Sequence, residues 1–120
     1  MKRNQIILIS LLLLSLAGCV QKSYKRTVVV TLSVPNIKDI KTAGIRGEGK
    51  PLSWNTDYEM KPVVKDSLYK ATITAVTGYK FAEIKFTVNG VFELKDQPNR
   101  RIIFSDKDTT YFNAVFDSNK

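Results

Sequence analysis

Apolar and polar residues alternate with a period of two along most of the chain, which is typical of strands that bury one face. In residues 27–34 the alternation places Val28, Val30, Leu32 and Val34 on the same side. No long stretch shows the 3.6-residue period of an amphipathic helix. The pattern therefore predicts an all-β domain.

Further strand-like segments recur at intervals of about 8 to 12 residues, with turn residues between them. They are 43–47, 68–76, 81–88, 101–104 and 109–117, whereas the segment YEMKPV at 58–63 is ambiguous. Seven or eight short strands of this kind favour an immunoglobulin-like antiparallel β-sandwich, in which two sheets pack face to face. We expect this sandwich to occupy residues 27–120 as a single domain.

The longest apolar run lies at the N-terminus, where the period of two breaks down. Two cations at positions 2–3 precede the segment IILISLLLLSL at 6–16, and the sequence LAGC ends at Cys19. A basic start, an apolar core of 11 residues and a small-residue exit are typical of a secretory signal peptide. The core is too short to span a bilayer as a helix. We therefore predict that residues 1–18 are a cleaved signal peptide.

The ending LAGC also resembles the lipobox of bacterial lipoproteins, in which the cysteine becomes the new N-terminus and carries a diacylglyceryl group and a further acyl chain such as palmitate. Cys19 is the only cysteine, so no internal disulfide can form. The alternative is a stray thiol in a leader. We expect Cys19 to be lipidated, because several acyl chains at about 0.8 kcal/mol per buried methylene would anchor the chain to a membrane.

Residues 19–26 then form a lipidated basic tether, which can meet anionic head groups at the membrane surface. The residues after Cys19 carry no acidic run, which favours an outer-membrane lipoprotein on the periplasmic face over surface display. Without residues 1–18 the chain keeps 17 Lys and Arg against 11 Asp and Glu, a net side-chain charge of +6. Since these charges are scattered and the protein is exported, a nucleic-acid partner is not expected.

The residue inventory argues against an enzyme. The chain has no histidine, and its one cysteine is assigned to lipid, so Ser-His-Asp and Cys-His arrangements are absent. Zinc lacks its usual nitrogen ligand, and the motif DKD at 106–108 indicates a turn rather than a calcium loop. We expect no catalytic residues, no metal and no cofactor.

A β-hairpin is predicted around the dipeptide NG at 89–90, which is the preferred signal for a two-residue type I′ turn. This turn pairs the two flanking valines, then Thr87 with Phe92, and further out Lys85 with Leu94. Lys85 and Phe92 thereby become diagonal neighbours on the outward face. The alternate residues line the core: Ala82, Ile84, Phe86 and Val88.

The same register places Glu93 opposite Phe86 on the inner face. A carboxylate there is costly unless it is paired. We therefore expect a bulge or a short second strand at this point.

Several motifs between about Lys41 and Asp117 follow one another in a familiar order: GEGKPLSWN, LYKATIT, GYKFAEIKF, the ring and acid FE, and PNR. In this order the chain resembles the starch-binding and glycogen-binding modules, which are carbohydrate-binding domains with an immunoglobulin-like sandwich. The resemblance implies that Trp54 and Phe92 are the two aromatic platforms of a sugar site and that Lys85 is its polar contact. It also implies a structural role for residues 98–100 before the next strand.

The chemistry of such a site needs no proton transfer. An exposed ring stacks on the apolar C–H face of a glucan, while Lys and Asn side chains bond its hydroxyl groups. Asn55 and Glu93 are further candidate contacts, with an ordinary loop asparagine and a solvated strand carboxylate as the alternatives. Trp54 alternatively belongs to the core, and Lys85 alternatively is a solvated outward residue.

The sequence thus predicts a non-catalytic, lipid-anchored cell-envelope protein that binds an α-glucan or a related glycan. The alternative is a structural lipoprotein whose sandwich contacts an envelope protein partner and binds no sugar.

Overall fold

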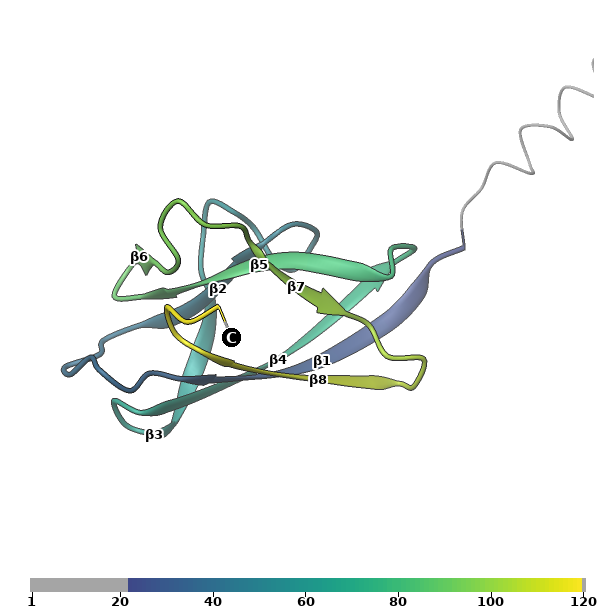
Figure 1. Cartoon of the computed structure of the whole chain (residues 1–120). Helices are drawn as coiled ribbons and strands as arrows, with labels where there is room; N and C mark the ends of the chain where they lie inside the picture. Colours follow the sequence, from purple (N-terminus) through teal and green to yellow (C-terminus); the bar gives the residue numbers. More distant parts are fainter. Residues whose placement is uncertain (1–21, 120) are drawn as a thin grey trace, which may run out of the picture.

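The computed structural model describes residues 22–119, so the predicted signal peptide and Cys19 lie outside the described part. Eight strands and no helix make up this part (Figure 1). In chain order they are β1 (Tyr24–Ser33), β2 (Ala43–Gly47), β3 (Tyr58–Val64), β4 (Leu68–Thr77), β5 (Phe81–Val88), β6 (Val91–Phe92), β7 (Arg100–Ile103) and β8 (Thr109–Val115). The predicted all-β class is confirmed. β1 begins before residue 27, so the last residues of the proposed tether already belong to the domain.

The strands join in one sheet with the order β6-β5-β2-β3-β4-β1-β8, and β7 also pairs with β5. β1 and β8 run parallel, whereas β1 and β4, for example, are antiparallel. The sheet curls over on itself into a half-barrel with β5 and β7 above β1 and β8 (Figure 1). The expected two separate antiparallel sheets are therefore not confirmed, because the observed sheet is continuous and mixed.

β3 is the strand that makes the sheet continuous. Its first residues, Tyr58 to Met60, pair with β2, and its later residues pair with β4. The pairing with β4 shifts between Pro62 and Val64, which is the irregularity expected where a proline cannot donate to the ladder. The segment that was ambiguous in the sequence is therefore the bend between the two halves of the half-barrel.

The core lies between the two halves and is filled by alternate residues of the long strands. The buried set includes Val28, Val30, Leu32, Ile45, Tyr69, Ile73, Ile84, Phe86, Val88 and Ile102. The inward faces predicted for residues 27–34 and 81–88 are confirmed at these positions. Within residues 22–119 the buried core residues lie between Val28 and Ala114, and they form one cluster. We expect residues 22–120 to fold on their own.

Candidate functional site

The hairpin formed by β5 and β6 has the predicted register. Val88 pairs with Val91, and Thr87 pairs with Phe92. Asn89 and Gly90 have φ angles of 51° and 77°, as a type I′ turn requires. The Oδ1 atom of Asn89 accepts hydrogen bonds from the backbone N–H groups of residues 41 and 42, at 2.7 and 3.2 Å. The turn is thereby fixed to the segment that leads into β2.

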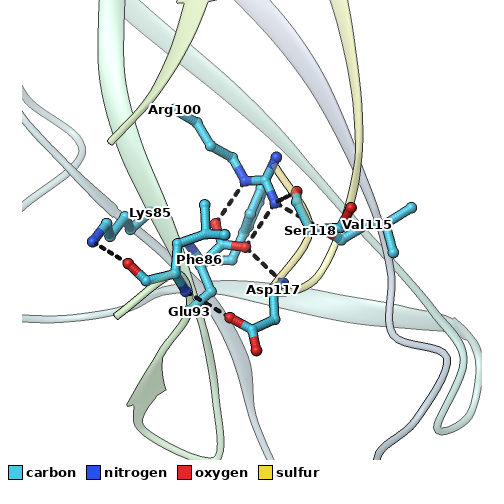
Figure 2. Close-up of polar contacts among 8 residues, drawn as sticks. Lys85, Phe86, Glu93, Arg100, Val115, Asp117 and Ser118 are labelled. Atoms are coloured by element: carbon cyan, nitrogen blue, oxygen red, sulfur yellow. Dashed lines mark hydrogen bonds and ion pairs between the residues drawn. The ribbon is translucent and has the colours of Figure 1, made fainter. Parts of the chain in front are cut away.

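The second strand of the hairpin is short, as the position of Glu93 predicted. β6 ends at Phe92. The next residue, Glu93, points inward and is only 1% exposed. One carboxylate oxygen accepts from the Phe86 N–H at 3.0 Å and from Arg100 Nε at 2.7 Å. The other accepts from Arg100 Nη2 at 2.8 Å and from the Asp117 N–H at 3.0 Å (Figure 2). Four internal donors therefore satisfy this carboxylate.

Arg100 completes this cluster, which we call the Glu93–Arg100 clamp. Besides the bidentate ion pair, Nη2 donates to the carbonyl oxygens of Val115 and Ser118, at 2.8 and 2.6 Å. Asp117 in turn accepts from the Leu94 N–H at 2.8 Å. The clamp ties the segment after β6 to the end of β8 (Figure 2).

Glu93 therefore holds the fold and is not free to bond a sugar, which corrects its place among the candidate contacts. It is not a solvated carboxylate either, since its side chain is fully buried. The resemblance implied a structural role for residues 98–100. The position of Arg100 agrees with that role, although the sequence did not pair it with Glu93.

The two predicted platforms meet on the surface. Trp54, in the loop before β3, and Phe92, in β6, line one shallow depression of about 500 Å³ together with Lys85. The other lining residues are Val91, Glu93, Lys95 and Asp96. Phe92 is 42% exposed and Trp54 is half-buried. Trp54 is thus not a core residue, and both rings present surface to solvent.

Lys85 supplies a cation within this depression. It lies on β5, half-buried, and its Nζ donates to the Leu94 carbonyl oxygen at 3.0 Å. An ammonium group has three donors, so two remain for a ligand. Leu94 itself is buried rather than outward as the register predicted, because β6 ends before reaching it.

Arg46 links the two platforms, and the sequence reasoning missed it. Its guanidinium carbon lies 5.1 Å from the centroid of the Phe92 ring, while Nη1 donates to the Trp54 carbonyl oxygen at 3.1 Å. Nε donates to Asp57 Oδ1 at 2.7 Å. The sequence offers only one signal for this role, which is that Arg46 is a polar residue next to Ile45 in the strand-like segment 43–47.

Asp57 is the ion-pair partner of Arg46. Its Oδ1 also accepts from Thr87 Oγ1 at 2.9 Å, and Thr87 is fully buried. Gly44 leaves the room that Asp57 needs, because a Cβ at this position would lie 2.6 Å from the Asp57 side chain. The outward Thr87 of the sequence prediction is therefore covered by the loop that carries Trp54 and Asp57.

Asn55 lies on the same loop as Trp54 but not in the lining of the depression. It is exposed, and its backbone N–H donates to Ser53 Oγ at 3.0 Å. Its side chain is available to a ligand that extends beyond Trp54.

Between residues 22 and 119 no group of three or more His, Cys, Asp or Glu residues is arranged to hold a metal ion. Within the same range no helix has the length and apolar character needed to cross a membrane.

No known protein-family model matches the sequence, and a comparison with curated proteins finds no match to it.

Proposed function

We propose that this chain is a non-catalytic, lipid-anchored cell-envelope protein that binds an α-glucan or a related glycan in the depression between Trp54 and Phe92. The observation that carries the proposal is the convergence of these two rings with Lys85 on one surface. Trp54 comes from a loop far from the hairpin that carries Lys85 and Phe92, and these are the three residues that the resemblance to starch-binding modules singles out for the sugar site. We also propose that the curled half-barrel is the counterpart of the immunoglobulin-like sandwich of those modules.

The geometry suits a sugar ring. Two partly exposed aromatic rings offer apolar faces to the C–H groups of a pyranose, and the ammonium of Lys85 offers donors to its hydroxyl oxygens. Binding in such a shallow depression leaves much of the ligand in water, which fits a polymer that continues on both sides. Lys95, exposed at the rim, adds a further donor.

The glucan proposal is tested by electrophoresis of residues 22–120 in native gels with and without glycogen. We expect the protein to be retarded in the glycogen gel and not in a gel of the same density without polysaccharide. Trp54 is the only tryptophan, so its fluorescence reports on this surface alone. We expect a shift of the emission on addition of maltoheptaose. Unchanged mobility and unchanged emission would reject sugar binding here.

The alternative function is docking of an envelope protein. It is favoured by Val91, which is 66% exposed beside the partly exposed Phe92 at the tip of the hairpin. Apolar and aromatic side chains of this kind are common at the centres of protein interfaces. If glycogen leaves mobility unchanged, crosslinking from a photoreactive residue at position 91 to an envelope protein is the result that this alternative expects.

We further propose that Cys19 carries the lipid and that the protein lies on the periplasmic face of the outer membrane. The support is the LAGC sequence at the end of the apolar run. Cells that express the full chain are expected to incorporate labelled palmitate into it, and a Cys19→Ser variant is expected to lose the label. Equal labelling of both proteins would place the lipid elsewhere.

A further inference from the structure

A second and larger cavity, of about 550 Å³, lies at the end of the half-barrel where β1 begins and β4 turns into β5. In Figure 1 this is the end at which the chain enters the domain. The inner walls are apolar and include Val28, Ile73, Ala75, Ala82, Ile102 and Phe104. The cavity shares no lining residue with the depression at Trp54.

The size and the lining of this cavity are those of a ligand site. The cavity opens to solvent, since Val76 and Tyr79 in its lining are exposed, and its inner end is lined by buried residues such as Val28 and Ile73. Pockets that hold small molecules measure about 300 to 1,000 Å³ and are mostly apolar with a few polar groups. The cavity falls in this range, and core residues of both halves of the sheet form its walls.

Arg26 is a half-buried cation among the residues that line the cavity. The alternation of β1 puts it on the inward face with Val28, although it is a cation. Its guanidinium carbon lies 5.2 Å from the centroid of the Tyr24 ring and 5.7 Å from that of Phe104. The guanidinium is thus within cation–π distance of two aromatic rings.

The hydrogen bonding of Arg26 is incomplete. Nη1 donates to the Ser105 carbonyl oxygen at 3.2 Å, whereas Nε is buried and has no acceptor. Within residues 22–119 the ion pairs are Arg46–Asp57, Arg100–Glu93 and Arg101–Glu83, and none involves Arg26. A buried donor without an acceptor is destabilising. An anionic group in the cavity, beside the guanidinium, would supply the missing counter-charge and could accept from N–H groups that the Ser105 carbonyl oxygen does not take.

The other charges around the cavity do not take this role. Glu83 is occupied by Arg101 and by Asn99, at 3.4 and 3.3 Å. Glu48 and Lys50 lie exposed on the loop at the rim and carry opposite charges. Of the two cations that line the cavity, Arg26 is therefore the half-buried one, and within residues 22–119 it has no counter-ion.

We propose that this cavity binds a single-chain amphiphile with a carboxylate head group, whose apolar chain lies among the core residues and whose carboxylate faces Arg26. The planar guanidinium matches a carboxylate in shape, and its single positive charge balances the single negative charge of the carboxylate. The site is independent of the proposed glucan function, since the two surfaces share no residue.

The test is calorimetric titration of residues 22–120 with decanoate and, in parallel, with 1-decanol, which has the same chain and no charge. We expect decanoate to bind one to one and at least about tenfold more tightly than decanol, as a charge-assisted hydrogen bond implies. In Arg26→Met the two ligands are expected to bind equally. Lys70→Met, which removes an exposed cation from the outward face of β4, is the matched control and should leave the difference unchanged.

A variant that fills the cavity, Ala75→Phe, is expected to weaken both ligands, and its circular dichroism shows whether it is folded. Amide shifts of the wild-type domain need no variant. On addition of decanoate they should concentrate at residues 75–77 and 81–83, which line the cavity. Absence of binding, equal binding of decanoate and decanol to the wild type, or shifts confined to other residues would overturn the proposal. Retardation by glycogen is measured in a separate experiment, so the carboxylate proposal and the glucan proposal can be rejected independently of each other.

Discussion

Trp54→Ala is expected to weaken glycogen binding by residues 22–120 about 30-fold, since removing a central aromatic contact commonly costs about 2 kcal/mol of binding free energy. Phe92→Ala should lose about tenfold, because its ring is smaller and stacks over less of the sugar. Each effect follows from the position of the ring at the depression, where it is partly exposed and can contact a ligand. The dissociation constant is measured from mobility in gels with a series of glycogen concentrations.

The matched control is Tyr111→Ala. Tyr111 is a large aromatic residue on β8, 74% exposed and outside the lining of the depression. Its removal should leave glycogen affinity within about twofold, since surface substitutions away from a site usually change little. Equal losses in Tyr111→Ala and Trp54→Ala would mean that the binding surface is not the depression.

Arg46 allows the bracing of the rings to be separated from the stacking itself. Arg46→Met keeps most of the apolar stem but removes the contacts to the Phe92 ring, to the Trp54 carbonyl oxygen and to Asp57. A cation–π contact at such a site contributes about 0.5 to 1 kcal/mol, so we expect a loss of about twofold to fivefold. A lysine at this position keeps the charge but not the fork of donors, and should not restore the affinity.

Features that depend on neighbours in sequence were predictable. The NG turn fixes φ > 0 at both central residues, and this sets the pairing of Thr87 with Phe92. The period of two likewise identified the inward residues of the strands, because one face of the sheet is buried. The short second strand followed from the cost of an inward Glu93.

Features that depend on distant segments were not predictable in the same way. The period of two is the same in a strand of a sandwich and in a strand of a curled sheet, so it could not show that β3 pairs on both sides. Local alternation gave no sign that the loop carrying Asp57 would cover Thr87 and reach Arg46. The partner of Glu93 was missed for the same reason, since ion-pair partners are set by the fold.

The candidate site shows both situations. Lys85 and Phe92 belong to one hairpin, and the register alone brings them together. Trp54 comes from another loop, and only the resemblance to starch-binding modules placed it with them. Asn55, its neighbour in sequence, does not line the depression, because adjacent residues of a loop point in different directions.

The second large effect is expected in the Glu93–Arg100 clamp. Arg100→Met should lower the free energy of unfolding by about 3 to 5 kcal/mol, because it leaves the buried Glu93 carboxylate without its counter-ion. The matched control is Arg101→Met, which removes a neighbouring arginine from an exposed pair with Glu83 at 3.4 Å. Exposed pairs contribute about 0 to 1 kcal/mol, so this control should stay near the wild type. Urea unfolding followed by Trp54 fluorescence measures both.

Glu93→Gln shows whether Arg100→Met is destabilising because hydrogen bonds are lost or because the Glu93 carboxylate is left buried without a counter-ion. In the single variant Arg100 keeps the carbonyl oxygens of Val115 and Ser118, so the loss should be smaller than in Arg100→Met. In the double variant, Glu93→Gln with Arg100→Met, a neutral amide replaces the buried carboxylate that has lost its counter-ion. The amide oxygen can still accept a hydrogen bond from a backbone N–H. We therefore expect the double variant to be more stable than Arg100→Met alone, with a coupling energy of at least about 1 kcal/mol. Losses that simply add would show that burial of charge is not what makes the clamp sensitive, and that the two side chains act independently.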